Sequence, residues 1–269
     1  MFSLGRSVDI KNSSNRWLVI ISFLVASVMA FFLMNLIDGL LIAFGFFLCW
    51  ALAREIDPKY ENAAFVAAFI FLGSTFLIND GLQIALLLWL LLAIRFISKI
   101  CGKIPTLFDV ITVVGFSAYL GYAFLSPLFL LLSFLMLIFA WIRYGRAKLY
   151  ISSAIVVLFL LVMISLIIPW QFSELFYLMM VDIKIFILWL ISILILFYFQ
   201  MQVLSWNKTY EDDLGGSLEY NWLQLALVFY GVALIGIILF VNISYSSLSL
   251  LLATIIGVNL HALYIVFNK

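Results

Sequence analysis

The feature that most constrains this chain is a succession of long apolar runs, each bounded by charged or turn-forming residues. Of the 269 residues, 67% are hydrophobic and only 10% are charged, whereas a soluble domain is roughly half apolar and a quarter charged. The runs lie at about residues 17–35, 39–53, 63–78, 82–97, 107–123, 127–142, 149–168, 183–204, 221–241 and 247–266. Because an α-helix needs about 20 apolar residues to cross a bilayer, the pattern predicts an all-α, polytopic integral membrane protein with about ten transmembrane helices. It excludes a water-soluble globule, a disordered chain, a fibrous repeat and a nucleic-acid binder.

The positions of the basic residues test the ten-span count. In a strictly alternating arrangement, thirteen of the fourteen Lys and Arg residues fall on one side of the membrane, and only Lys184 falls on the other. Basic residues concentrate on the cytoplasmic side, so we expect both termini there, five hairpins, and a location in a prokaryotic plasma (inner) membrane. Because residues 61–95 must hold two crossings and a turn, eight spans with one re-entrant hairpin is the competing count.

The charged segments divide the chain into four parts. They are a cytoplasmic N-terminal segment at 1–16, a membrane domain of four hairpins at 17–205, an acidic cytoplasmic loop at 206–220 and a final transmembrane hairpin at 221–269. The acidic loop is the best candidate for a flexible linker. A net charge of +1 indicates no polyanionic partner. The expected partners are the lipid bilayer and a membrane protein or a second copy of this chain, and no nucleic acid.

Two short segments resemble each other and indicate an internal repeat. Residues 36–43 read LIDGLLIA and residues 78–85 read INDGLQIA, with five of eight positions identical at an offset of 42 residues. Each segment opens an even-numbered span. A duplicated hairpin would relate neighbouring units by an axis along the membrane normal. Chance is the alternative, because short apolar sequences coincide easily.

The densest polar cluster in the first half is the predicted cytoplasmic loop after residue 53. Its candidate catalytic residues are Arg54, Glu55, Asp57 and Glu61. Three carboxylates could together hold Mg²⁺ against a substrate phosphate. The loop resembles the one on which membrane prenyltransferases of the ubiquinone-biosynthesis type carry an acidic motif, but here the later loop at 143–148 is basic where they need a second. The alternative is structural, because Asp57-Pro58 ends one helix and Glu61 favours the start of the next.

Three acidic residues open even-numbered spans at the predicted outer face, and they are candidate binding residues: Asp38, Asp80 and Asp182. They could surround a vestibule or a cation path, because acidic residues inside a membrane usually face a cavity or a partner. The alternative is that they cap helices, since Asp is favoured at helix N-termini. Asp38-Gly39 and Asp80-Gly81 are also typical of tight turns, which places the outer connections there.

The last apolar run carries small and polar residues at steps of four, which places them on one helical face. They are Ser249, Ala253, Gly257 and His261. Ser249, Gly257 and His261 are binding candidates if the face lines a pathway, and packing residues if it meets another helix. His261 could relay protons or pack against a carbonyl group. A single His excludes a multi-histidine metal site. We expect no cofactor, with Mg²⁺ entering only if residues 54–61 are catalytic.

Three functions fit these features. A transporter of a small solute or lipid is the first, because ten spans and repeated hairpins suit alternating access. The drug/metabolite transporter superfamily shares the ten-span count, but no residue motif here supports membership. The second is a membrane-embedded enzyme acting on a lipid-linked or phosphorylated substrate at the cytoplasmic face. The third is a non-catalytic membrane subunit or assembly partner, in keeping with the scarcity of polar residues in mid-span.

Overall fold

The structure is a computed structural model of the chain. It describes residues 3–5, 11–75, 84–145, 147–168, 170–173, 194, 197–198, 200–201, 210–211, 217–243 and 245–267.

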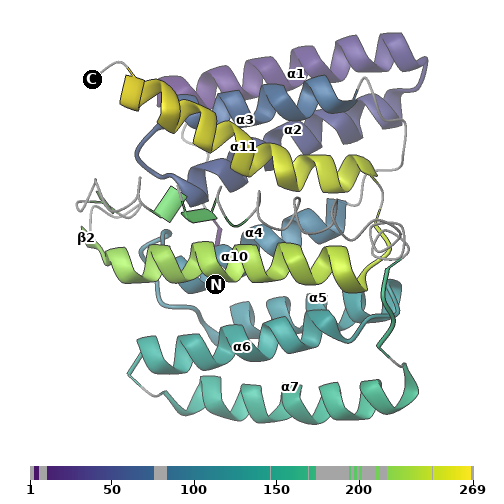
Figure 1. The fold of residues 1–269 in the computed structure, drawn as a ribbon, viewed down its shortest axis with the longest axis vertical. Coiled ribbons are helices and arrows are strands. Elements are labelled where there is room, and N and C mark those ends of the chain that lie inside the picture. Colours follow the sequence, from purple (N-terminus) through teal and green to yellow (C-terminus); the bar gives the residue numbers. More distant parts are fainter. Residues whose placement is uncertain are drawn as a thin grey trace. The chain divides into compact units, whose positions relative to one another are not determined.

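The described residues form nine α-helices and one short strand pair (Figure 1). The helices are α1 (Ser13–Leu33), α2 (Leu36–Ile56), α3 (Glu61–Thr75), α4 (Ile84–Ser98), α5 (Leu107–Ala123), α6 (Leu128–Arg143), α7 (Lys148–Ile167), α10 (Tyr220–Phe240) and α11 (Tyr245–Phe267). Each coincides with one predicted apolar run. The run at 183–204 lies almost entirely outside the described residues, so the count of ten, the five hairpins and the side of the termini stay predictions.

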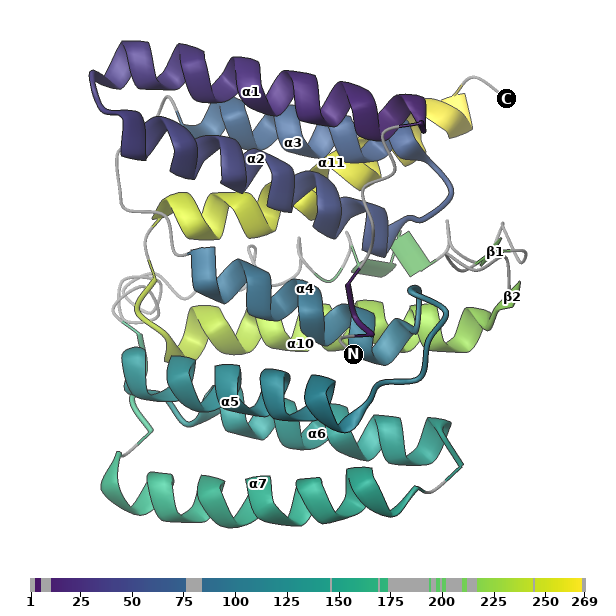
Figure 2. The ribbon, with the colours of Figure 1, turned by 180° about the vertical axis from the view of Figure 1, so that it is seen from behind.

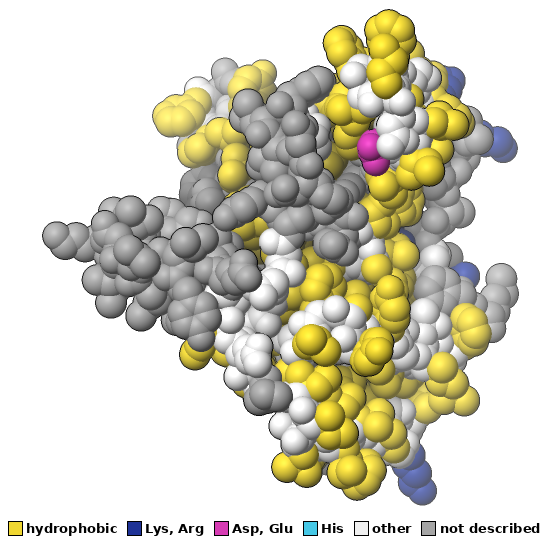
Figure 3. Space-filling model, turned by 90° about the vertical axis from the view of Figure 1, so that its right-hand side faces the viewer, with side chains coloured by type: hydrophobic (Ala, Val, Ile, Leu, Met, Phe, Trp, Pro, Cys, Tyr) yellow, Lys and Arg dark blue, Asp and Glu magenta, His cyan; other side chains and the backbone are white. Residues whose placement is uncertain are grey.

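Five of these helices are long and apolar enough to cross a membrane. They are α1, α2, α7, α10 and, within α11, Ser247–Ile265. Apolar side chains are also frequent over the described part of the face in Figure 3, which looks onto the ends of the helices. Phe23 and Phe31 of α1 and Leu166 of α7 are among the exposed large side chains. In water such a surface would aggregate, whereas in a bilayer it contacts acyl chains.

The chain divides into two compact units that do not follow sequence order. Unit 1 comprises Met1–Gly5, Leu92–Phe197 and Lys208–Ile243, and unit 2 comprises Arg6–Leu91, Tyr198–Asn207 and Ser244–Lys269. The helices of the predicted last hairpin, α10 and α11, therefore belong to different units. The four segment boundaries proposed from the sequence stay predictions.

Unit 2 is a bundle of α1, α2, α3 and α11 (Figures 1 and 2). Small residues allow its helices to approach closely. A Cβ atom added at Gly39 of α2 would lie 2.5 Å from the Ala30 nitrogen of α1. On α3, Ala63, Ala64 and Ala67 are fully buried. Both α2 and α11 pack against α3.

Unit 1 is built on α5, α6 and α7, with α10 packed against α6. The α5–α6 turn is closed by Leu125, whose φ of 48° is left-handed, and by a hydrogen bond from the Ser126 N–H to the Gly121 carbonyl. Gly145, with φ of 73°, lies in the α6–α7 turn. Because both turns are short and both pairs of helices pack together, α5 and α7 run in the same direction and α6 runs opposite.

The connection between α1 and α2 differs from the predicted turn at Asp38-Gly39. The turn lies one helical turn earlier, at Met34 and Asn35, where Met34 has a left-handed φ of 51°. Asn35 caps α2 by accepting a hydrogen bond from the Ile37 N–H at 3.0 Å. Asp38 and Gly39 are thus helical, and Gly39 serves the close approach to α1 rather than the turn.

Two sequence predictions fall on segments that are described only in part. In the acidic loop 206–220, β1 (Tyr210–Glu211) and β2 (Ser217–Leu218) pair antiparallel, with Tyr210 opposite Leu218. The second copy of the internal repeat, at 78–85, lies mostly in the undescribed segment 76–83. The duplication therefore stays a prediction.

Candidate functional site

The densest polar group of unit 2 lies where α2 ends and α3 begins; we call it the α2–α3 turn cluster. It contains Arg54, Glu55, Asp57, Tyr60 and Glu61, and His261 of α11. The sequence ends α2 here because Asp57 makes the last helical hydrogen bond, from its N–H to the Ala53 carbonyl at 2.9 Å. The next residue is a proline, which has no N–H and cannot continue the helix.

An ion pair joins the two helices across this turn. The Arg54 Nη2 atom lies 3.3 Å from the Glu61 Oε1 atom, and the side chains are 11% and 40% exposed. The Arg54 guanidinium carbon also lies 5.8 Å from the centre of the Trp50 ring. Arg54 lies in the last turn of α2, at the negative end of that helix dipole, and Glu61 lies in the first turn of α3, at the positive end of the other. Each charge is therefore stabilised by the dipole of its own helix. The Arg54 side chain is therefore largely enclosed, whereas the Glu61 side chain is open to solvent.

Asp57 is a buried carboxyl group, with 1% of its surface exposed. Its Oδ1 atom accepts a hydrogen bond from the Lys59 N–H at 3.3 Å, and its Oδ2 atom accepts none from the described residues. Burial raises the pKa of Asp57 to about 6, although backbone hydrogen bonds and the charges of Arg54 and Lys59 act to lower it. Glu55, on the last turn of α2, is also buried.

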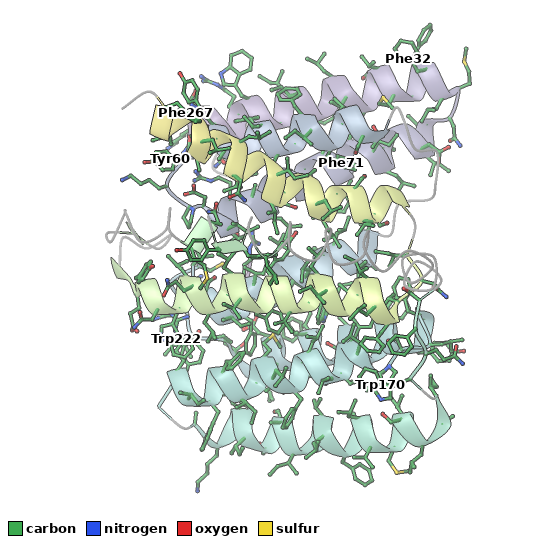
Figure 4. All side chains as sticks on the ribbon, viewed as in Figure 1. Phe32, Tyr60, Phe71, Trp170, Trp222 and Phe267 are labelled. Atoms are coloured by element: carbon green, nitrogen blue, oxygen red, sulfur yellow. The ribbon has the colours of Figure 1, made fainter. Side chains whose placement is uncertain are left out.

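His261 of α11 completes the cluster from the other side. Its ring centre lies 5.4 Å from that of Tyr60 and 6.3 Å from that of Tyr264. Within the described part of the chain its Nδ1 atom is buried and makes no hydrogen bond. Figure 4 shows Tyr60 near the end of α11 that carries Phe267, away from the end of α1 that carries Phe32. The sequence did not single out Tyr60, because nothing in its spacing links it to His261.

The stripe of small residues on α11 contacts α3. The Ser74 Oγ atom donates to the Ser249 Oγ atom at 3.0 Å. A Cβ atom added at Gly257 would lie 2.5 Å from the Ala67 nitrogen. These contacts, with that of His261 and Tyr60, follow the face predicted from the steps of four. The face packs helix against helix along its length.

Of the three acidic residues predicted at the outer face, only Asp38 lies in the part of the chain that the structure describes. The Asp38 Oδ2 atom accepts a hydrogen bond from the Asn35 Nδ2 atom at 2.8 Å, in the first turn of α2, where Asp38 is exposed. The cap of α2 is Asn35 itself, and Asp38 contributes a negative charge to the first turn, where the helix dipole is positive. Asp80 and Asp182 lie outside the described residues, so a shared vestibule stays a prediction.

The carboxylates of the α2–α3 turn cluster do not gather as metal ligands. Across the residues that the structure describes, no group of three or more His, Cys, Asp or Glu side chains is placed to hold a metal ion. Glu61 is instead paired with Arg54, and Asp57 with backbone N–H groups. The arrangement fits a breakable ion pair next to a protonatable acid better than a Mg²⁺ site.

Unit 1 carries a second polar contact set that the sequence did not reveal; we call it the N-terminal dock. Ser3 donates from its N–H to Asp109 Oδ1 at 2.8 Å and from its Oγ to Asp109 Oδ2 at 2.6 Å. The Leu4 carbonyl accepts from Arg95 at 3.3 Å and from the Cys101 thiol at 3.5 Å. Asp109 is also the capping-box partner of Thr106 at the start of α5.

Next to this dock, aromatic and basic residues join the ends of several helices. The Arg143 guanidinium donates to the Ile97 carbonyl and lies 4.7 Å from the centre of the Trp222 ring of α10. The Tyr144 hydroxyl donates to the Phe96 carbonyl at 3.3 Å, and burial raises the pKa of Tyr144. These bonds satisfy carbonyl groups left over at the end of α4. Trp222 is labelled in Figure 4.

The fold and its polar sites define a class of protein. A helical chain with five helices able to span a bilayer, and with buried ionisable groups, is a multi-pass integral membrane protein. No protein family matches the sequence, and no curated protein or solved structure matches the chain.

Proposed function

We propose that this protein is a transporter of a small solute or lipid and that the α2–α3 turn cluster is its gate at the predicted cytoplasmic face. The observation that carries the proposal is the burial of Glu55 and Asp57 beside Arg54, whose side chain is 11% exposed, at the end of a largely apolar helix bundle. Ionisable side chains are expensive inside a membrane protein and are typical of substrate and ion pathways.

The geometry of the cluster supports a gate in two ways. The Arg54–Glu61 pair joins α2 to α3 and is partly exposed, so its breaking would free one helix from the other at small cost. Asp57, whose pKa is about 6, changes protonation near physiological pH. A proton on Asp57 would remove a negative charge beside Arg54 and strengthen the hold of Glu61 on that guanidinium.

The enzyme and the non-catalytic subunit stay as alternatives. A phosphate-directed enzyme of the kind inferred from the loop needs several carboxylates around one cation, and the described residues provide no such group. No described contact favours a subunit role over transport.

The test is flux through vesicles that contain the purified protein. One set of vesicles encloses the pH dye pyranine and receives pools of amino acids, sugars and organic acids; another contains phosphatidylglycerol with a fluorescent chain, whose passage between leaflets is read by dithionite quenching. We expect flux above that of empty vesicles in one set. Arg54→Gln is expected to reduce it at least about tenfold, the ratio that corresponds to 1.4 kcal/mol.

A charge reversal separates the gate from a simple loss of folding. The double change Arg54→Glu with Glu61→Arg restores the pair with the opposite order, and it is expected to recover part of the flux lost in either single change. Arg16→Gln, which removes an exposed cation from α1 of the same compact unit, serves as the matched control and is expected to leave the flux unchanged. Absence of flux in both vesicle sets, or equal flux in the wild type and Arg54→Gln, would overturn the proposal.

A further inference from the structure

A groove runs between α5 and α7 in unit 1, whereas every residue of the proposed gate belongs to unit 2. Its volume is about 370 Å³. The residues that line it are Leu107, Val110, Ile111, Val114 and Gly115 of α5, and Ser152, Ser153, Val156 and Val157 of α7. Both helices pack against α6, which supports them from one side.

The side chains that line the groove leave its interior unfilled. Gly115 has no side chain, and a Cβ atom built there would meet no other atom within 4 Å. The lining is apolar except for Ser152 and Ser153, and the Ser152 hydroxyl donates to the Leu149 carbonyl at 3.0 Å within its own helix. The walls therefore suit a hydrocarbon chain.

The length of the groove matches one leaflet of a bilayer. From Leu107 to Gly115, the lining on α5 rises about 12 Å, which is close to half of the roughly 30 Å hydrocarbon core. A packed helix from another protein would follow α7 across the whole core. A groove that ends at half depth fits an acyl chain that enters from one side.

Two exposed lysines precede the groove-lining residues of α5 and α7. Lys148 is the first residue of α7 and lies one turn before Ser152, so Lys148, Ser152 and Val156 share a face. Lys103 lies four residues before Leu107, which begins α5, and both lysines are exposed. Because α5 and α7 run in the same direction, both lysines are at the same end. In addition, none of the described side chains caps the first turn of α7, and its N–H groups favour an anion.

We propose that this groove binds one anionic phospholipid, with an acyl chain along Gly115 and Val156 and the phosphate group at Lys103 and Lys148. The apolar walls bind the acyl chain of any phospholipid, and the lysines select a headgroup with a net negative charge. By the predicted orientation the lipid belongs to the cytoplasmic leaflet. The proposal does not depend on transport, since it concerns binding alone.

The experiment measures lipid binding to the full chain in detergent. Native mass spectrometry counts bound lipids, and the melting temperature is followed as phosphatidylglycerol or phosphatidylcholine is added. We expect one retained phosphatidylglycerol per chain and a rise in melting temperature that phosphatidylcholine does not match. Lys148→Gln is expected to weaken phosphatidylglycerol binding about fivefold, the effect of one lysine at an anionic lipid surface, whereas Lys59→Gln leaves it unchanged.

Variants that fill the groove test the position of the acyl chain. Gly115→Leu places a side chain in the open space and is expected to abolish retention of phosphatidylglycerol while the protein stays folded. Val156→Phe fills the groove from α7 and gives a second readout if the first variant is poorly folded. Gly73→Leu is the matched control, because a Cβ atom there also meets nothing within 4 Å but lies on α3.

Three results would overturn the proposal. They are equal retention of both lipids, retention of phosphatidylglycerol in the two groove-filling variants, and protection by inorganic phosphate alone as great as that by phosphatidylglycerol. None of them involves flux, so each is distinguishable from failure of the transport assay.

Discussion

Asp57 provides a pH dependence that can be predicted with its sign. Burial raises the pKa of Asp57 to about 6 from an ordinary 3.8. Between these values the folded protein binds a proton that the unfolded chain does not, so stability falls as the pH rises from about 4 to about 6 and changes no further above that. Asp57→Asn keeps the Oδ1 acceptor without the charge. We expect it to exceed the wild type in stability at pH 7 by up to about 3 kcal/mol and to equal it at pH 4.

Thermal unfolding in detergent between pH 4 and pH 8 measures this difference. Asp38→Asn controls for the loss of one negative charge, because Asp38 is exposed. Parallel curves for the wild type and Asp57→Asn across the whole range would contradict the raised pKa.

At the N-terminal dock, the Ser3 hydroxyl group binds the N-terminal segment to Asp109 of α5. Ser3→Ala removes the Oγ bond to the Asp109 carboxylate; hydrogen bonds to charged groups contribute about 1.5–3 kcal/mol. The Leu4 carbonyl lies against the Cys101 thiol, which is buried. We expect release of the dock to raise the rate of Cys101 alkylation by N-ethylmaleimide at least about tenfold.

The second cysteine serves as an internal control for this measurement. Cys49 lies buried within α2, in the other compact unit, and its alkylation is expected to stay slow in both proteins. Peptide mass mapping separates the two sites. Equal rates at Cys101 in the wild type and Ser3→Ala would show that the dock does not protect it.

At the scale of elements, the contact between α3 and α11 depends on a residue without a side chain. At Gly257 even a methyl group would lie 2.5 Å from the Ala67 nitrogen and 2.6 Å from the Ala67 Cβ atom, and backbone cannot move aside cheaply. Gly257→Ala is therefore expected to destabilise the protein by about 1–3 kcal/mol through overpacking. Gly73→Ala, on the open side of α3, is expected to be neutral or to stabilise by about 0.5–1 kcal/mol.

Melting temperatures of the two variants give the comparison. If Gly257→Ala were as stable as Gly73→Ala, the two helices would not be in contact at this residue.

Local patterns predicted these elements well and their contacts poorly. The helix at 107–123 begins and ends as the apolar run does, because Thr106 and Asp109 form a capping box at its start. The predicted start of α2 is too late in the sequence. Asp38-Gly39 is typical of a turn, but Asn35 caps the helix, which begins at Leu36. The α11 face was predicted, but its partner α3 was not. Ser3 and Asp109 are 106 residues apart, and no periodicity connects such a pair.

At the scale of the whole molecule, the positive-inside prediction becomes a labelling pattern. The predicted outer turns hold Met34 and Leu125, which are 85% and 64% exposed. The predicted inner segments hold Lys59 and Lys103, which are also exposed. Ser126 is unsuitable for labelling because it is buried, and Gly102 is unsuitable because its φ of 73° disfavours cysteine.

Single cysteines at these four positions, in a chain without Cys49 and Cys101, read the topology from intact cells. Each compact unit contributes one outer and one inner position, so the units are tested separately. We expect an impermeant maleimide to label Met34→Cys and Leu125→Cys at once, and Lys59→Cys and Lys103→Cys only after the membrane is permeabilised. Labelling of Met34→Cys and Lys59→Cys from the same side would mean that α2 does not cross the membrane. The cluster at its end would then lie outside the cytoplasm, and the gate would be assigned to the wrong face.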